Sequence, residues 1–387
     1  MKIGVYISGN MPSYWAHSIN VAKTANAFHS LGHKIELIAP ASMRCAFMKK
    51  KLGNLSLHYG ISENLTMKWL KPSLYAYFSD RTFQDEKFSS NAASYARKKE
   101  FDLVYCRSYL IPYCTVKLGV PTLVESHTNL FDNPDMQVLY RIAKDDSFKA
   151  LVTIHESIKV EHIRRGVPAE KILVLEDGVD IERFDLDDNS RVWRKHLGLN
   201  LDKNYAVYCG QLFKGKGIEF LLKVAQQMQK NKSLTFLLIG GMKKDIIHWK
   251  KYCSIEKINN VIFTGFVTNS EVPKYLKAAD CLLMPYDPEI VSTFDYGTTS
   301  PLKLFEYMAA QRPIVATNLN TINKVVRNGA DAILVDIGDI DGFCQAIENL
   351  IHNVSLGRKM SENAFIKVRK YTWNQRCKKI LEHVGYS

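Results

Sequence analysis

Long apolar runs are missing from this sequence. No stretch reaches the ~18 consecutive apolar residues that a membrane-spanning helix needs. The N-terminal run MKIGVYISG meets Gly9, Asn10 and Pro12 too early to form a signal peptide. We therefore expect a cytoplasmic protein, with peripheral attachment at the inner face of the membrane as the one membrane role left open.

Paired cysteines are missing as well. The chain has eight cysteines, but no two of them form a CxxC pair. Cys106, Cys209 and Cys281 lie in apolar, strand-like runs. This pattern argues against a zinc site or a disulfide framework and favours buried free thiols in a reducing compartment.

Two familiar phosphate-binding signatures are also absent. The glycine-rich stretch YCGQLFKGKGIEF lacks the GK[ST] of a P-loop and the spacing of a GxGxxG dinucleotide turn. The sequence shows no repeat of solenoid period and no low-complexity tract. These absences exclude the P-loop and dinucleotide classes by motif and leave an ordinary globular protein.

Positive charge is abundant and spread along the whole chain. Lysine and arginine number 52 against 39 aspartate and glutamate residues, which gives a net charge of +13. Residues 1–180 and 181–387 are both basic, so there is no detached basic tail. A broad positive surface favours phosphorylated ligands, anionic lipid or nucleic acid. No recognition-helix or base-stacking motif supports nucleic acid, and we expect none as a partner.

Short β-branched runs alternate with helix-length stretches in both halves of the chain. Continuous apolar strands between helices indicate parallel sheets covered on both faces. Two such series in 387 residues predict two doubly wound α/β domains. The predicted strands are 2–8, 34–39, 103–106, 122–125, 151–154 and 172–175, then 205–209, 235–239, 261–264, 281–284, 314–316 and 333–335.

The polar, aperiodic stretch GVDIERFDLDDNS separates the two series. We expect an N-terminal Rossmann-like domain over 1–182 and a C-terminal one over 190–370. The last segment, 371–387, has apolar residues at helical spacing and is expected to join the N-terminal domain. Ligands of open α/β sheets bind at the carboxyl ends of strands, so the informative residues should follow strands.

The stretch TTSPLKLFEYMA, from Thr298 to Ala309, predicts an apolar helix with an unusual start. Ser300 can cap the helix and Pro301 suits its first position. Lys303, however, opposes the helix dipole. A bound anion would resolve that conflict, and Glu306 can accept two hydrogen bonds from a vicinal diol. Phosphate and diol together indicate a nucleotide. A capped core helix with a solvated lysine and a structural glutamate is an equal alternative.

Two further stretches follow predicted strands. In the glycine-rich turn, Gly210 lets the backbone approach a ligand, and Lys216 can reach phosphate oxygens. In VESHTNLF, Glu125 and His127 come directly after a strand, and a histidine of near-neutral pKa can donate or share a proton. Singly, a glycine-lysine turn and a lone histidine are more often structural.

The first βα loop, SGNMPSYWAHSIN, is long. Gly9 would allow a substrate close to the backbone, Asn10 lies beside it, and Ser18 is expected to cap the next helix. We expect this loop to hold an acceptor or its phosphate, although an ordinary βα loop is the simpler interpretation. Two D-x-D strings, 185–187 and 339–341, could hold Mg²⁺ or Mn²⁺, but we interpret both as solvated turns.

Two stretches mix basic and apolar residues: CAFMKKKLGN (45–54) and KWLKPSLYAYF (68–78). Such a composition suits an interface with an anionic membrane. The sequence alone favours a solvated face with a few core anchors.

Taken together, these pieces resemble the family 4 retaining glycosyltransferases of GT-B fold. The resemblance spans nearly the whole chain and rests on five fragments in the same order. They are HSLGHKIELIAP, LVTIHESIKVEHIRRGVPAEKILVLEDGVDIERF, YCGQLFKGKGIEFLL, VIFTGFVTNSEVPKYLKAADCLLMPY and SPLKLFEYMAAQRPIVAT. The fold it implies is two doubly wound Rossmann-like domains that face each other across a cleft.

The resemblance also implies roles for individual residues. Glu306 matches the glutamate that holds the donor ribose, Lys216 the lysine on the donor diphosphate, and His127 the histidine near the transferred sugar. These three are the expected catalytic residues, and no metal or other cofactor is expected. The full set expected to bind the donor is Gly210, Gln211, Lys216, Thr298, Thr299, Ser300, Pro301, Leu302, Lys303 and Glu306.

Two positions depart from the family pattern. Gln211 stands where the family usually has an arginine, and Thr298 stands where it has the glutamate that contacts the donor sugar. We expect a retaining glycosyltransferase that moves a sugar from a UDP- or GDP-sugar to a glycan or lipid-linked acceptor in cell-surface polysaccharide or glycolipid synthesis. The two departures keep open a non-catalytic protein that binds nucleotide or glycan. A nucleotide-sugar epimerase of the same fold is the other alternative.

Overall fold

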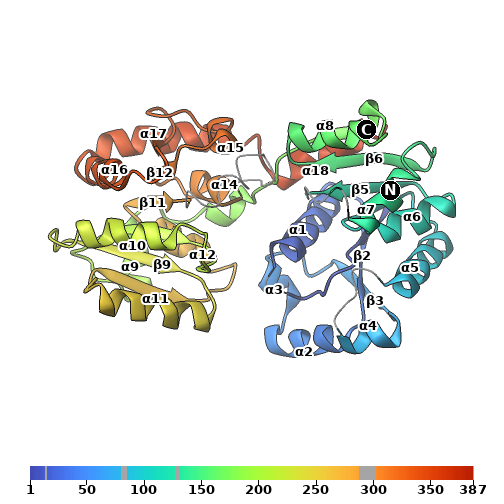
Figure 1. Ribbon diagram of the computed structural model, residues 1–387, viewed down its shortest axis with the longest axis horizontal. Helices are drawn as coiled ribbons and strands as arrows, with labels where there is room; N and C mark the ends of the chain where they lie inside the picture. Colours follow the sequence, from blue (N-terminus) through green and yellow to red (C-terminus); the bar gives the residue numbers. More distant parts are fainter. Residues whose placement is uncertain (14, 80–84, 128–130, 132, 287–301, 387) are drawn as a thin grey trace. The chain divides into compact units, whose positions relative to one another are not determined.

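The described residues fold into two compact units, each built on one parallel sheet (Figure 1). The computed structural model describes the chain except residues 14, 80–84, 128–130, 132, 287–301 and 387. The first unit holds Met1–Gly178 and the C-terminal segment from Trp373. The second unit holds the described residues from Val179 to Thr372.

The first unit has a seven-stranded sheet in the order β3-β2-β1-β4-β5-β6-β7. The pairings between these seven strands are parallel, and β1, β4 and β5 are neighbours at the centre of the sheet. The carboxyl ends of these central strands therefore lie at one edge. The strands are β1 Lys2–Tyr6, β2 Lys34–Pro40, β3 Thr66–Leu70, β4 Leu103–Cys106, β5 Thr122–Ser126, β6 Phe148–Thr153 and β7 Ile172–Val174. The helices are α1 Ala16–Ser30, α2 Met43–Leu52, α3 Leu55–Tyr59, α4 Leu74–Ser79, α5 Glu86–Lys99, α6 Leu110–Lys117, α7 Pro134–Tyr140, α8 Glu156–Arg164, η1 Ala169–Lys171 and α18 Trp373–His383.

The second unit has a six-stranded parallel sheet in the order β10-β9-β8-β11-β12-β13. Its strands are β8 Asn204–Cys209, β9 Leu234–Ile239, β10 Val261–Gly265, β11 Cys281–Met284, β12 Ile314–Thr317 and β13 Ile333–Val335. Its helices are η2 Ile181–Phe184, α9 Ser190–His196, α10 Ile218–Gln227, α11 Lys243–Ile255, α12 Val272–Lys277, α14 Leu302–Ala309, α15 Asn320–Asn323, α16 Ile340–His352 and α17 Val354–Val368.

The sequence pattern explains these layers. All residues of β4, β11 and β12 are buried, as expected for strands covered on both faces. Helix α16 buries Phe343, Ile347 and Leu350 at helical spacing and packs beside the equally amphipathic α10. Two hydrophobic clusters cover the β8–β13 sheet.

All twelve predicted strands are present, with ends that shift by up to a few residues, and the doubly wound α/β class is confirmed. The edge strand β3 was not predicted, because its five residues are at most half-buried and form no continuous apolar run. The eight cysteines are free, as expected. The aspartates of both D-x-D strings are exposed: Asp185 and Asp187 lie in the linker, and Asp341 lies in the first turn of α16. Asp339 caps α16 by accepting a hydrogen bond from the Gly342 amide at 2.8 Å.

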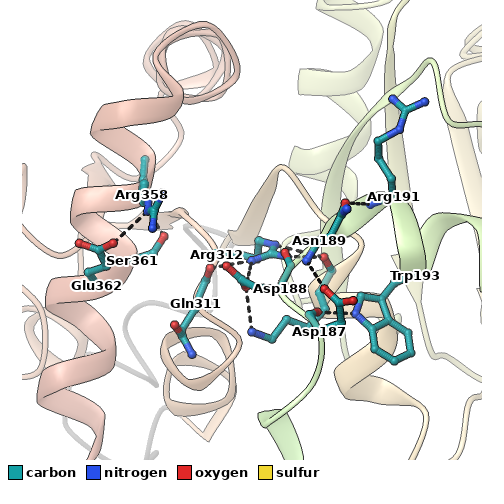
Figure 2. A network of polar contacts seen from close by, with 12 residues as sticks. Asp187, Asp188, Asn189, Arg191, Trp193, Gln311, Arg312, Arg358, Ser361 and Glu362 are labelled. Atoms are coloured by element: carbon teal, nitrogen blue, oxygen red, sulfur yellow. Dashed lines mark hydrogen bonds and ion pairs between the residues drawn. The ribbon is translucent and has the colours of Figure 1, made fainter.

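The polar linker before α9 is tied to the second unit by a charged cluster (Figure 2). Asp188 accepts hydrogen bonds from Arg312 Nη1 at 2.7 Å and from Lys277 Nζ at 3.0 Å. Burial opposes the charge of Asp188, but the two cations outweigh it and lower the pKa of the carboxyl group. We assign this cluster a structural role and no catalytic one, because the carboxylate of Asp188 neutralises two buried cations.

The C-terminal helix α18 belongs to the first unit. It contacts α1, and Cys377 Sγ lies 3.7 Å from the main-chain oxygen of Thr24. Gly178 lies against its start, since a Cβ there would be 2.5 Å from the Trp373 nitrogen. The helix thereby brings side chains from the end of the sequence into the first unit.

Candidate active site

Helix α14 carries the only described part of the unusual stretch. Lys303, in its first turn, donates a hydrogen bond from Nζ to Tyr208 Oη at 2.6 Å and lies 4.1 Å from the centre of that ring. Burial, followed by the positive charge of Lys216, lowers the pKa of Lys303 to about 7. A lysine held out of water beside a second lysine is favourable only with a negative partner.

The glycine-rich turn after β8 allows this close approach. A Cβ at Gly210 would lie 2.5 Å from Lys303 Cε, so only glycine leaves room for the lysine. Gly217, with a φ of 74°, is the N-cap residue of α10, and a Cβ there would lie 2.8 Å from the Pro285 backbone. Lys216 sits in the same turn, and burial lowers its pKa. Gln211 is exposed.

Glu306 lies one turn along α14 from Lys303 and is 28% exposed. Arg183 of η2 approaches it, with Nη1 at 3.6 Å from the glutamate Oε1. The other end of the guanidinium donates to Asn269, at 2.7 Å from its Oδ1. Two lysines, one arginine and one carboxylate thus gather at the carboxyl end of β8.

Helix α14 is fixed to the sheet below it. The Cys209 amide donates to Tyr307 Oη at 2.9 Å, and this hydroxyl donates to the Leu283 main-chain oxygen at 3.3 Å. Cys209 belongs to β8, and Leu283 belongs to β11. These two hydrogen bonds anchor the helix that carries Lys303 and Glu306 to the sheet.

A second charged cluster lies in the first unit, after β4 and β5. His127 is 13% exposed, and both of its ring nitrogens are bonded. Nε2 lies 2.5 Å from Glu125 Oε1, and Nδ1 lies 2.8 Å from Arg107 Nη2. Because arginine only donates, Nδ1 must accept, and Nε2 carries the proton donated to Glu125.

Glu125 is the centre of this cluster. Tyr105 donates its hydroxyl to Oε2, and Arg376 of α18 forms an ion pair with the same oxygen at 2.9 Å. The side chains of Glu125 and Arg376 are 0% and 3% exposed. Burial alone would raise the pKa of Glu125, but Arg376, His127 and Arg107 hold it well below its usual range. Asp177 also favours the charged form of Arg376, so two carboxylates and two arginines balance one another in this buried cluster.

His17, near the start of α1, is affected by the same charges. Burial, followed by the positive charge of Arg107, lowers the pKa of His17 to about 3. The imidazole is therefore neutral at physiological pH. Burial and the charge of Arg107 would also oppose the binding of a positively charged ligand at this position.

Glu125, His127 and Asp177 each offer a ligand atom, all within 4.8 Å of one another. The oxygens of Glu125 are already bonded to Tyr105, His127 and Arg376. A metal ion would also have to displace or tolerate guanidinium charge at this position. The donor set fits an internal ion-pair network better than a metal centre.

The first βα loop is held by internal hydrogen bonds. Ser18 Oγ donates to the main-chain oxygen of Asn10 at 3.2 Å and lies 2.6 Å from Ser13 Oγ. Asn10 Oδ1 accepts from Ser42 Oγ at 2.7 Å, and Gly9 is buried beside it. The prediction that Ser18 caps α1 is wrong, because the helix begins at Ala16 and its cap is Trp15.

The structure brings Gly210, Lys216, Lys303 and Glu306 together in the second unit, and Leu302 begins α14 there. His127 and the Gly9–Asn10 loop belong to the first unit. Four predicted residues, Thr298, Thr299, Ser300 and Pro301, lie outside the described residues.

Three arginines were missed by the sequence analysis: Arg107, Arg183 and Arg376. Arg107 follows β4 in the same way that His127 follows β5, and this position could have marked it. Arg183 lies in what the sequence indicates only as a linker. Arg376 is 251 residues from its partner Glu125 by sequence number, so no local pattern points to it.

Family comparisons match both units. Residues 19–183 match the family described as Glycosyltransferase Family 4, and residues 203–353 match Glycosyl transferases group 1. This chain is a family 4 glycosyltransferase. Its fold is GT-B, and the family resemblance expected from the sequence is confirmed.

The glycosyltransferase is distantly similar to characterised and solved relatives. HepE of Anabaena, solved with UDP and glucose, superimposes with a TM-score of 0.72 at 16% identity over 99% of both chains. The capsular polysaccharide biosynthesis glycosyltransferase CapM of Staphylococcus aureus is 29% identical over 59% of this chain and 61% of its own length. An Escherichia coli UDP-Gal:α-D-GlcNAc-diphosphoundecaprenol α-1,3-galactosyltransferase is 23% identical over 70% of this chain and 72% of its own.

Proposed function

We propose that this glycosyltransferase binds the diphosphate of a nucleotide sugar on Lys216 and Lys303 and its ribose on Glu306. The observation that carries the proposal is the pair of partly buried lysines, Lys216 and Lys303, beside Glu306. Burial lowers the pKa of both lysines. A diphosphate would restore their charge, and the carboxylate can accept both hydroxyls of a diol. Arg183, 3.6 Å from Glu306, adds positive charge and orients the carboxylate.

Lys303 also accounts for one departure from the family pattern. Gln211, which replaces the usual arginine, is exposed, and its neutral amide adds no charge. Lys303 instead reaches Gly210 at the start of the same turn. The leaving diphosphate is then stabilised by two lysines, fixed before the reaction begins, and this stabilisation requires no metal ion.

His127 contributes the sugar-side contacts from the first unit. Its ring is held by Arg107 and Glu125, and Arg376 holds Glu125 in turn. His127 acts by presenting a fixed, neutral ring edge near the transferred sugar, and Arg107, Glu125 and Arg376 are positioning residues. The sugar is transferred with retention of its anomeric configuration.

The acceptor is a glycan or a lipid-linked sugar of cell-surface polysaccharide or glycolipid synthesis, and the donor is a UDP- or GDP-sugar. Support comes from relatives: CapM by its name acts in capsular polysaccharide synthesis, and the Escherichia coli relative by its name acts on a diphosphoundecaprenol-linked sugar. The basic surface of the chain is compatible with such anionic acceptors.

The first test is a thermal-shift screen of wild type and Glu306→Ala with UDP, GDP, ADP and their sugars. A ligand that binds only the native state raises the melting temperature. We expect a selective shift for one nucleotide, lost in Glu306→Ala and kept in Glu219→Ala, whose exposed carboxylate lies in α10. No shift with any nucleotide would contradict the donor site.

The second test separates transfer from its alternatives. The nucleotide sugar identified by the screen is incubated with and without short glycan and polyprenyl-diphosphate acceptors, and products are resolved by mass spectrometry and NMR. A new α-linked product with an α-linked donor supports retaining transfer. Saturable binding with neither transfer nor donor hydrolysis would favour the non-catalytic alternative, which Gln211 motivates. Interconversion of the sugar without acceptor would favour an epimerase.

A further inference from the structure

Arg107 has a hydrogen-bonding nitrogen that the cluster around Glu125 does not use. One of its terminal nitrogens, Nη2, donates to His127 Nδ1 at 2.8 Å. The other, Nη1, is buried and has no hydrogen-bond partner among the residues that the structure describes. A buried N–H group without an acceptor costs stability. An oxygen atom of a ligand would supply the missing acceptor.

The two arginines of this cluster differ in the carboxylates that hold them. Arg376 forms an ion pair with Glu125 Oε2 at 2.9 Å, and Asp177 also favours its charged form. The terminal nitrogens of Arg376 lack well-aligned hydrogen bonds too, but two carboxylates balance its charge. Arg107 forms no ion pair with any described residue, and its side chain donates to the neutral ring of His127 instead. Both carboxylates of the cluster are therefore concentrated on one of its two arginines.

The charge of Arg107 is not cancelled on the side that faces α1. Burial and then the charge of Arg107 lower the pKa of His17 on that helix, and the opposing effect of Glu125 is smaller. His17 is neutral as a result. A negatively charged group beside Arg107 would therefore be stabilised, because it would meet a positive charge that nothing else at this side balances.

His127 cannot itself donate a hydrogen bond to a substrate in this arrangement. Its Nε2 holds the ring proton and lies 2.5 Å from Glu125 Oε1, and its Nδ1 accepts from Arg107. Both ring nitrogens are therefore used within the protein. The proposed function places this ring near the transferred sugar, so the N–H group available to the sugar at this place belongs to Arg107.

We infer that Arg107 is a specificity-determining residue that binds a carboxylate on the transferred sugar, which makes the donor a nucleotide uronic acid. This inference rests on the proposed function, which puts the sugar beside His127. Arginine stays charged and recognises carboxylates through charged hydrogen bonds. A neutral hexose has a primary hydroxyl group in place of the carboxylate. That hydroxyl would accept the hydrogen bond but would leave the charge of Arg107 without a partner.

The first test compares donors that differ only in this group, on the wild-type protein. The pairs are UDP-glucuronic acid with UDP-glucose, UDP-galacturonic acid with UDP-galactose, and GDP-mannuronic acid with GDP-mannose. Isothermal titration calorimetry gives each dissociation constant, with UDP and GDP alone as references. In at least one pair with the base that the protein binds, the uronic acid should bind at least about tenfold tighter, as expected for a charged hydrogen bond. Neutral sugars that bind as tightly as their uronic acids in every pair would overturn the inference.

The second test changes Arg107 itself. Arg107→Met removes the charge and the N–H groups, so the uronic acid and its neutral partner should bind equally well, while UDP or GDP alone binds as it does to wild type. Arg107→Lys keeps a charge but loses the planar guanidinium and should keep part of the preference. The matched control is Arg141→Met, at an exposed arginine of the same unit, which should keep all of it.

The results separate a sugar contact from a purely structural role. If Arg107 served only to orient His127, Arg107→Met would weaken both members of a pair equally, and that result would overturn the inference, as would an unchanged preference. If Arg107→Met does not fold by circular dichroism, the wild-type pairs and Arg107→Lys decide. Nucleotide binding without a preference for uronic acid contradicts this inference alone. No binding of UDP or GDP to wild type would contradict the donor site and this inference with it.

Discussion

The two charged clusters of this glycosyltransferase differ in how their charge is balanced. In the first unit, Glu125 lies among Arg376, Arg107 and His127, and each partner is already in hydrogen-bond or ion-pair contact. In the second unit, Lys303 and Lys216 are desolvated together, with lowered pKa values, and Glu306 is 3.6 Å from Arg183. One cluster is balanced by the protein itself; the other has an excess of positive charge.

This difference indicates that the first cluster serves folding stability and the second serves the binding of an anionic ligand. Breaking a buried, balanced network leaves an uncompensated charge, so its members should matter for folding. Removing a desolvated lysine costs the folded protein little but removes charge that an anionic ligand would use. Mutations in the first cluster should therefore lower stability, and mutations in the second should lower nucleotide affinity.

The largest effect is expected for Glu125→Gln. The carboxylate of Glu125 neutralises Arg376, which is 4% exposed, so its loss should lower the free energy of unfolding by about 3–5 kcal/mol. Urea denaturation followed by circular dichroism measures this. Glu161→Gln is the matched control, because Glu161 also binds two arginines but at the surface, and should cost less than about 1 kcal/mol.

The double variant Glu125→Gln/Arg376→Met separates charge balance from packing. Removing both charges should recover part of the lost stability, since no buried ion is left alone. Additive destabilisation would show that the two residues do not act as a pair.

The next largest effect is expected for Lys303→Met, which should lower nucleotide affinity rather than stability. Nucleotide affinity should fall by about ten- to a hundredfold, as for the loss of a charged hydrogen bond of about 1.5–3 kcal/mol. The stability of the unliganded protein should be unchanged or higher, because a buried cation is removed. Isothermal titration calorimetry and urea denaturation measure the two quantities. Lys214→Met, in the same turn but exposed, should change neither by more than about twofold.

A pH effect of intermediate size follows from the same lysine. Lys303 has a lowered pKa of about 7 in the unliganded protein, and a bound diphosphate raises it, so binding takes up a proton above that pH. Affinity should therefore fall by up to about tenfold per unit as pH rises above 7. Lys303→Arg stays charged and should give a flatter profile; matching profiles in the two proteins would disprove the assignment.

The same lowered pKa of Lys303 makes the stability of the unliganded protein change with pH in the opposite direction to nucleotide affinity. Between about pH 7 and the ordinary lysine value of 10.5, the unfolded chain holds a proton on this side chain that the folded chain has lost. Unfolding then takes up protons, so stability without ligand should rise through this window.

The smallest effect is expected for Arg183→Gln. Its ion pair with Glu306 is long, and both side chains are partly exposed, at 17% and 28%, so stability should change by less than about 1 kcal/mol. Nucleotide affinity should fall a few fold, because one cation and the orientation of Glu306 are lost. A loss as large as that of Lys303→Met would shift the main phosphate contact to Arg183.

The sequence predicted every strand with a continuous apolar run, because burial on both faces leaves a local pattern. It missed β3, an edge strand whose residues are at most half-buried. Lys303 and Glu306 were recognised from their conflict with an ordinary helix start, which is also local. His127 was recognised from its place after β5, but its neutral, doubly bonded ring was not predictable, because Arg107 and Arg376 come from other elements.

Local spacing by itself determined the two parallel sheets, the helix with Lys303 and Glu306, and the glycine-rich turn, since each depends on residues within a few positions of one another. The tertiary structure alone decided that Arg376 reaches Glu125 and that Arg183 reaches Glu306. It also decided that Phe47 and Phe78 are exposed together rather than buried. The charge balance and the exposure of a side chain depend on which distant segments touch it. The packing of helices and loops around the sheets sets those contacts, and local spacing does not encode them.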